Sequence, residues 1–292
     1  MAAWLVARPQ NAVLGLAATL LLPILQIVSG IIMVLLVLRQ GPRLAVIEGS
    51  VAGALLVAIA AIVGAPVMQI VIAVLSVWLP AVLTGVVLQW TRSVALTLQV
   101  SALLAGAAVL VFYALVVDKV AYWQHLMTAL LEWARENNLP EQAQLMEARP
   151  AMTADMLTMA YVLASWVSYA IYMLLGYRLF SQLPGQTQDF GRFCDLSFGR
   201  VIALMLGVLS RLAFATGAAW IQSTAFVLFV VFFLQGLAVV HWMYTDGRLP
   251  LFVVIATYVL MPVLHVFLLM ALALLGYMDA WFQFRRRARG QQ

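Results

Sequence analysis

Long stretches without a single charged residue dominate the hydropathy pattern of this chain. A helix needs about 20 apolar residues to cross a bilayer core of roughly 30 Å, and each stretch reaches that length. The apolar residues run continuously and do not alternate with polar ones, which favours transmembrane helices over a transmembrane β-barrel. The uncharged stretches are 9–38, 49–91, 93–117, 156–177, 212–245 and 249–278.

This pattern predicts an all-α fold, a polytopic transmembrane helix bundle of about eight apolar segments. We expect one integral membrane domain over residues 1–292, with an external amphipathic helical insertion at 118–152 and a basic C-terminal tail at 282–292. The predicted segments are 11–38, 44–63, 66–90, 93–117, 153–177, 200–220, 223–245 and 249–276.

Composition narrows the class of protein further. Hydrophobic residues make up 65% of the chain and charged residues 9%, with a mean hydropathy of +1.04. Soluble domains usually carry about 25% charged residues. These values exclude a disordered chain, a disulfide scaffold and an ordinary soluble enzyme. Cys194 is the only cysteine, so no disulfide can form within the chain.

The distribution of charge orients the predicted segments. The net charge is +5, and every basic residue except Lys119 is an arginine. Basic and non-basic loops alternate, which places 39–43, 91–92, 178–200 and 246–248 in the cytoplasm and 118–152 outside. Arginines spread over loops in this way indicate topology and not a nucleic-acid surface, so we expect no nucleic-acid partner.

The two end segments leave the topology open. Each is about 28 residues long, or about 42 Å as a helix, with a central proline at Pro23 or Pro262. Eight single crossings would put the basic tail outside, against the tendency of arginine to stay in the cytoplasm. Either each end segment is a helical hairpin that returns to its starting side, or each is one long kinked helix. The charge pattern favours the hairpin.

The predicted insertion begins with an amphipathic helix. Apolar residues recur at a spacing of three to four, and Asn137, Asn138 and Pro140 end the pattern. Such a helix either lies on the membrane surface or packs as a cap over the outer mouth of the bundle. The apolar positions are Trp123, Leu126, Met127, Leu130 and Ala134.

Motifs of catalysis and metal binding are missing from the sequence. It contains no G-x-x-x-x-G-K-[ST], no H-E-x-x-H, no C-x-x-C and no G-x-S-x-G. Its three histidines lie in three separate segments. We therefore expect no catalytic residues, no metal site and no cofactor, and predict that the protein is not an enzyme.

Three polar residues in apolar segments are the candidate ligand-binding groups. Arg211 lies midway along its segment, where an arginine costs about 2.5–3.5 kcal/mol on insertion scales. It either binds an anionic group inside the bundle or reaches the lipid headgroups from a segment end. Gln235 and His241 follow in the next segment. Each is either a ligand-binding side chain or a hydrogen-bonded packing residue.

Small residues suggest positions of close helix packing, and the C-terminal end suggests an anchor at the membrane interface. Small side chains allow helices to approach closely, and we expect helix packing at Gly236, Ala54, Ala58, Ala102 and Gly106. Aromatic and basic residues near the end of the last segment suit the lipid headgroups. The predicted interface anchors are Asp279, Trp281, Arg285 and Arg286, with Asp279 paired to Arg286 seven residues on along one helical face.

Two C-terminal stretches carry a resemblance to a known family. Residues 233–241 (FLQGLAVVH) and 276–285 (GYMDAWFQFR) resemble the YybS-like family of predicted bacterial inner-membrane proteins. Pro23 and the turn 39–43 (RQGPR) look similar to that family too. The family has no assigned biochemical function. The resemblance implies an S-component-like core, related to the substrate-binding subunits of energy-coupling-factor transporters, with the rod-shape protein MreD grouped nearby.

Two functions follow as hypotheses. The first is a transport-related membrane protein that binds a small molecule, has no ATPase of its own and works with a coupling subunit. The second is a structural or scaffolding protein of the bacterial cell envelope, in the manner of MreD, with an envelope protein as its partner. The sequence names neither ligand nor oligomeric state.

Overall fold

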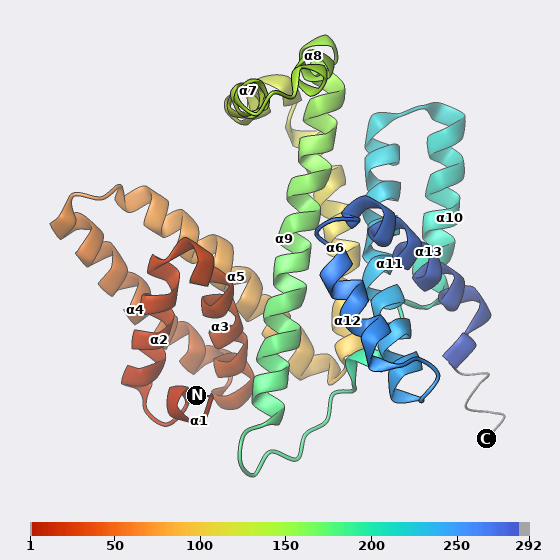
Figure 1. Cartoon of the computed structure of the whole chain (residues 1–292). Helices are drawn as coiled ribbons and strands as arrows, with labels where there is room; N and C mark the ends of the chain where they lie inside the picture. The colour runs from red at the N-terminus through yellow and green to blue at the C-terminus, as the bar shows by residue number, and fades with distance from the viewer. Residues whose placement is uncertain (1, 286–292) are drawn as a thin grey trace. The chain divides into compact units, whose positions relative to one another are not determined.

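A computed structural model describes residues 2–285, and these residues form an all-helical protein (Figure 1). Seven helices are long and apolar enough to cross a membrane: α4, α5, α6, α9, α10, α11 and α13. The predicted polytopic helical fold is therefore confirmed. The helices are α1 (Ala2–Leu5), α2 (Pro9–Leu21), α3 (Gln26–Gln40), α4 (Pro42–Val63), α5 (Val67–Thr91), α6 (Val94–Leu115), α7 (Lys119–Glu136), α8 (Pro140–Ala148), α9 (Pro150–Ser181), α10 (Gly199–Thr216), α11 (Ala219–Thr245), α12 (Leu251–Leu260) and α13 (His265–Phe282).

The helices group into two compact units. Unit 1 comprises Met1–Leu98 and Trp166–Phe193, and unit 2 comprises Gln99–Ser165 and Cys194–Gln292. Helix α9 runs unbroken from one unit into the other.

The first apolar segment is a helical hairpin in unit 1. It breaks at a single 3₁₀ turn, Pro23–Leu25, between α2 and α3. Proline lacks the backbone N–H that a continuous helix needs at this place. The Ser29 hydroxyl donates to the Leu16 carbonyl at 3.1 Å, which joins the two arms. Pro9, at the start of α2, lines a groove with Ile47 of α4, so the hairpin returns to the end from which it starts.

Helix α3 is the core of unit 1. Ten consecutive residues, Ser29 to Leu38, are buried, so this helix packs on all sides. A Cβ at Gly85 of α5 would lie 2.9 Å from Val37, and one at Gly176 of α9 would lie 2.7 Å from Val34. Neighbouring helices thus approach α3 through positions that lack a side chain.

Helix α11 has the corresponding central place in unit 2. Its membrane-spanning window is 83% buried, far more than any other span. The preceding turn lies at Gly217, where φ is +64°, and not at 221–222 as the pattern of neutral residues predicts. Glycine adopts this left-handed conformation without a steric penalty, which ends α10 four residues earlier than expected.

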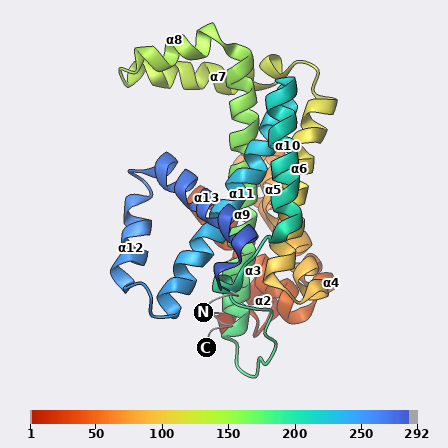
Figure 2. The ribbon, with the colours of Figure 1, turned by 90° about the vertical axis from the view of Figure 1, so that its right-hand side faces the viewer.

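The last apolar segment is a second hairpin, formed by α12 and α13. Figure 2 shows the two arms joined by the turn that contains Pro262. The Arg285 guanidinium, just beyond α13, donates to the carbonyls of Cys194 and Leu196, which precede α10. Cys194 in turn packs against Trp242 near the end of α11. The second arm therefore ends close to where the first arm begins.

The two hairpins resolve the conflict in the charge pattern. Because both end segments turn back, we expect six complete crossings, by α4, α5, α6, α9, α10 and α11, although α13 is also long and apolar enough to span. With six crossings, the positive-inside tendency predicts that every basic loop, the start of α2 and the end of α13 lie on one side of the membrane. We call this the basic side. Of the basic tail, residues 286–292 lie outside the described residues.

The predicted insertion consists of two helices, α7 and α8, between α6 and α9. The Asp118 carboxylate accepts a hydrogen bond from the Ala121 N–H at 3.0 Å and caps the start of α7. Helix α7 ends at Glu136, directly before Asn137 as predicted. Arg135 and Glu147 form an ion pair that joins α7 to α8.

Candidate functional site

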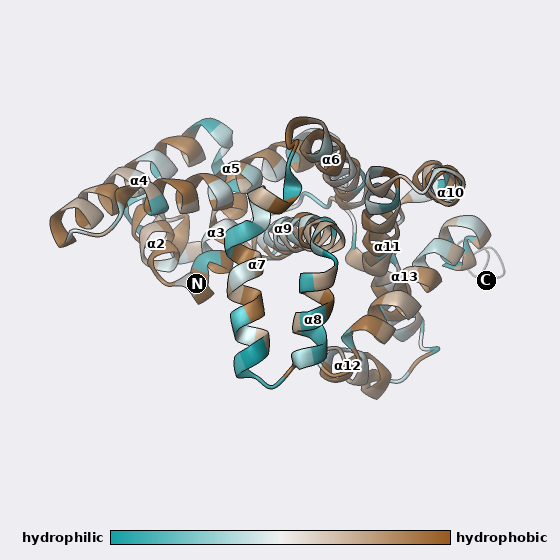
Figure 3. Cartoon of the chain, turned by 90° about the horizontal axis from the view of Figure 1, so that it is seen from above, coloured by the Kyte–Doolittle hydropathy of each residue, from teal (hydrophilic) through white to brown (hydrophobic). Residues whose placement is uncertain are grey.

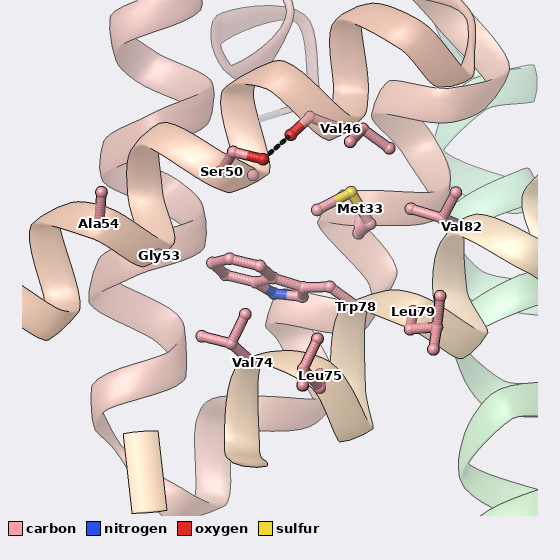
Figure 4. A pocket seen from close by; sticks show the side chains of 11 residues that line it. Met33, Val46, Ser50, Gly53, Ala54, Val74, Leu75, Trp78, Leu79 and Val82 are labelled. Atoms are coloured by element: carbon pink, nitrogen blue, oxygen red, sulfur yellow. Dashed lines mark hydrogen bonds between the residues drawn. The ribbon is translucent and has the colours of Figure 1, made fainter. Parts of the chain in front are cut away.

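An apolar cavity between α3, α4 and α5, open to the outside past the exposed side chains of Val46, Leu75 and Leu79, is a candidate site in unit 1 (Figure 4). Its volume is about 280 Å³. Small-molecule sites usually measure about 300–1,000 Å³, so this cavity suits a small ligand or one end of a longer one. It is lined by Met33, Val46, Gly49, Ser50, Gly53, Ala54, Val74, Leu75, Trp78, Leu79 and Val82.

The indole of Trp78 forms a fixed wall of this cavity. Its Nε1 donates to the Ser29 hydroxyl at 2.8 Å, and Ser29 donates onward to the Leu16 carbonyl at 3.1 Å. Trp78 is 5% exposed and Ser29 fully buried. The chain of bonds fixes the ring orientation, because each polar hydrogen is satisfied within the protein.

Glycines on α4 leave the space that the cavity occupies. A Cβ at Gly53 would lie 3.5 Å from the Trp78 ring, an ordinary contact, so a small side chain fits there and a large one would enter the cavity. Ser50 is the polar side chain of the lining, and its hydroxyl already donates to the Val46 carbonyl at 2.8 Å. The site therefore recognises apolar shape and offers no charge to a ligand.

A second groove lies on the other face of α4, against α2. Its volume is about 460 Å³, and Glu48 is the ionisable residue in its wall. Glu48 is 8% exposed and is hydrogen-bonded to Gln40 at the end of α3. The groove is lined by Pro9, Gln10, Val13, Leu14, Ile47, Glu48 and Val51.

The three predicted ligand-binding residues do not form one site. Arg211 is exposed on α10, twelve residues or about 18 Å along the helix from Gly199. Gln235 is fully buried beside the start of α10, where it accepts a hydrogen bond from the Phe198 N–H at 2.7 Å. His241 contacts Tyr258 of α12, with 3.3 Å between Nε2 and the phenol oxygen.

Gln235 belongs to a buried polar network that the sequence does not predict. Its amide donates to the Asp279 carboxylate at 2.8 Å, and Arg285 donates to the same carboxylate oxygen at 2.6 Å. Arg285 also donates to the carbonyls of Cys194 at 2.7 Å and Leu196 at 2.6 Å. The second oxygen of Asp279, Oδ1, is buried without a hydrogen-bond partner among the described residues. The network attaches α13 to α11 and to the segment before α10.

Two of the predicted interface anchors lie inside this network. Asp279 is 3% exposed and Arg285 7%, so neither side chain faces lipid headgroups. Trp281 is 37% exposed. Arg286, the expected partner of Asp279, lies outside the described residues. Arg285 reaches Asp279 because α13 ends at Phe282 and Gln283 adopts a left-handed conformation with φ +52°, which turns the chain back.

The predicted packing residues divide into two groups. A Cβ at Gly236 would lie 1.9 Å from the Leu272 carbonyl oxygen, and the reciprocal Gly276 approaches Phe232 as closely, so α11 and α13 meet backbone to backbone. Ala102 and Gly106 are buried, and Gly106 faces α11. Ala54 and Ala58 of α4 are exposed, and Ala54 lines the same cavity as Gly49 and Gly53.

A second polar cluster joins α6, α7, α9 and α11 in unit 2. Tyr113 donates to the Asp155 carboxylate at 2.7 Å and lies 3.0 Å from the Ser223 hydroxyl. Lys119 pairs with Asp155 and lies over the Tyr113 ring. The sequence places Asp155 only near a segment end, because its partners Tyr113 and Lys119 lie 42 and 36 positions away along the chain.

Nothing in the described residues resembles a metal centre, since no three His, Cys, Asp or Glu side chains gather there. The sequence does not predict that Trp78, Gly49 and Gly53 line a cavity, because aromatic and small residues within an apolar helix resemble ordinary packing positions.

Comparison with known proteins identifies a family and no activity. Neither a curated protein nor a solved structure matches the chain significantly. A family profile described as Predicted membrane protein (DUF2232) matches residues 11–280. The match begins within α2 and ends within α13, and it covers every helix between them in full. On this match, the chain belongs to the DUF2232 family of predicted membrane proteins.

Proposed function

We propose that this protein is a membrane-embedded binding component of a transport system, located in the bacterial inner membrane and without an ATPase of its own. Its ligand is a small apolar or amphipathic molecule, bound in the cavity beside Trp78. The YybS-like and S-component-like relation belongs to this proposal, as does a partner that couples binding to energy.

The cavity is the observation that supports this function. Its walls come from α3, α4 and α5, and Trp78 is held rigidly by its bond to Ser29. A preformed cavity with rigid walls binds without losing the entropy of ordering its side chains. Glycines at 49 and 53 keep it open, although larger apolar residues would pack α4 against α5 more tightly.

Filling the cavity is expected to abolish binding. Gly53→Leu places a side chain against Trp78, whereas Gly53→Ala adds one methyl group at ordinary contact distance. We expect wild type and Gly53→Ala to carry one stoichiometric small molecule after gentle extraction, and Gly53→Leu to carry about tenfold less. Mass spectrometry of the purified proteins measures this directly.

The controls separate a ligand from solvating lipid. All three proteins should elute as single species with similar melting midpoints, which shows that Gly53→Leu is folded. A mixture that matches the bulk membrane lipids would overturn the proposal. Retention of the same molecule by Gly53→Leu would move the binding site elsewhere.

A structural role in the cell envelope is the second candidate. The observation that favours it is the α7–α8 insertion, which carries exposed charges and is joined by the Arg135–Glu147 pair. A scaffold would present such a surface to another envelope protein. The same purification discriminates the two functions, because a scaffold would bring envelope proteins and no stoichiometric small molecule.

A further inference from the structure

Helix α7 has three distinct faces. At about 100° per residue, Tyr122, Leu126, Ala129 and Trp133 fall within about 60° of one another around the helix axis. All four are exposed, with 59% of Tyr122, 43% of Leu126 and 55% of Trp133 accessible. We call these four residues the exposed stripe. Two other faces flank it, one buried in the protein and one polar.

The buried face fixes α7 to the membrane-spanning helices. The Trp123 indole donates to the Thr158 hydroxyl of α9 at 2.9 Å, and Met127 packs with Trp123 against Ala154. The Trp123 ring lies 6.2 Å from that of Phe112 in α6. The Tyr122 ring lies edge-on to Phe112 at 5.2 Å, so the exposed stripe adjoins this buried face at its first residue, while Leu126 and Trp133 remain exposed.

The polar face adjoins the stripe on the side opposite the buried face. It carries both signs of charge and no large apolar side chain, and hydrophilic residues are more frequent in α7 and α8 than in the long helices of unit 2 (Figure 3). A helix with adjoining apolar and polar faces is suited to the boundary between lipid and water. The polar face consists of Gln124, His125, Thr128, Glu132, Arg135 and Glu136.

The position of α7 along the chain places the stripe at this boundary. Three residues separate the end of α6 at Leu115 from the start of α7 at Lys119, and they span at most about 13 Å. One residue, Arg149, separates α8 from α9. Since α6 and α9 are membrane spans, both ends of the insertion are held at the membrane surface.

The residue types of the stripe fit lipid headgroups. Tyrosine and tryptophan, whose rings are apolar with one polar atom, are enriched where headgroups meet the acyl chains. Tyr122 and Trp133 stand at the two ends of the stripe, eleven residues or about 16 Å apart along the helix, with Leu126 between them. These residue types therefore suit a helix that lies at the headgroup level.

We propose that the exposed stripe of α7 rests on the lipid bilayer and anchors the α7–α8 insertion along the membrane surface. The buried face caps the helices of unit 2 while the stripe contacts lipid. The two roles expected for this helix from its sequence are thus carried by different faces.

Position-specific fluorescence quenching tests this proposal. Cys194→Ser removes the native thiol, and Leu126→Cys or Thr128→Cys then introduces one label site on the stripe or on the polar face. Each protein is labelled with an environment-sensitive fluorophore and reconstituted into phosphatidylcholine–phosphatidylglycerol vesicles. Quenching is measured with headgroup-region doxyl lipid and with aqueous iodide. Trp133→Cys provides a second stripe position.

The expected result is a reciprocal pattern. Probes at 126 and 133 should be quenched several-fold more by doxyl lipid than the probe at 128, and several-fold less by iodide. Equal iodide quenching at 126 and 128 would overturn the proposal, because the stripe would then lie in water. Shielding of 126 and 133 from both quenchers would also overturn it and would indicate that a protein surface covers the stripe.

Discussion

Replacing Gly236 with alanine is expected to destabilise the protein by about 3 kcal/mol. The new methyl carbon would lie 1.9 Å from the Leu272 carbonyl oxygen, and backbone cannot move aside as the end of a flexible side chain can. Helices α11 and α13 would have to separate along their whole contact, which also stretches the bond from Gln235 to Asp279. Thermal unfolding in detergent measures the loss as a drop of several degrees in the midpoint.

Gly207→Ala is the matched control for this substitution. Gly207 lies within α10, and a Cβ there would lie 3.6 Å from the Tyr277 hydroxyl, an ordinary contact. Alanine also has the higher helix propensity, so the control should be neutral or slightly stabilising. Equal midpoints for Gly236→Ala and Gly207→Ala would contradict the backbone-to-backbone contact.

Removing one partner of the buried ion pair is expected to cost more. Arg285→Met leaves the Asp279 carboxylate buried without its cation, and such losses typically cost 3–5 kcal/mol. Substituting both residues, as in Asp279→Leu with Arg285→Met, should cost clearly less than the two single changes added together, because no charge then remains buried. Unfolding midpoints of the four proteins complete the double-mutant cycle.

The native cysteine reports the local consequence of the same change. Cys194 is 8% exposed, and its carbonyl accepts a hydrogen bond from Arg285. Loss of this bond should speed maleimide labelling of Cys194. Arg135→Met serves as the control, since the Arg135–Glu147 pair is exposed on both sides and should contribute less than about 1 kcal/mol. In the double-mutant cycle, additive effects of Asp279→Leu and Arg285→Met on stability would show that the two residues do not interact.

The helices could be predicted from the sequence because their cause is local. An uncharged stretch of sufficient length must satisfy its backbone hydrogen bonds internally, and each stretch forms helix where expected. Hydropathy does not distinguish a hairpin from a long kinked helix, since both bury the same apolar residues. In both end segments the decisive hint is the charge pattern, and the break occurs at the central proline.

The candidate sites could not be predicted because they depend on distant pairings. Gln235 and Asp279 are 44 residues apart in the chain, and Arg285 meets Cys194 across 91 residues. The expected pairing of Asp279 with Arg286 assumed a continuous helix, whereas Gln283 turns the chain after Phe282. The Trp78 cavity exists because glycines face the ring, which only the arrangement of three helices reveals.

The side on which α13 ends is the most direct test of the architecture, because the six crossings require the last segment to turn back. In a Cys194→Ser background, single cysteines replace Thr216 before the α10–α11 turn, Arg248 after α11, or Phe284 after α13, all exposed positions. Sealed vesicles of defined orientation are then treated with a membrane-impermeant maleimide. The hairpin predicts that positions 284 and 248 label from the same side and position 216 from the opposite one. Labelling of 284 together with 216 would mean that the last segment crosses the membrane once, and would contradict the architecture.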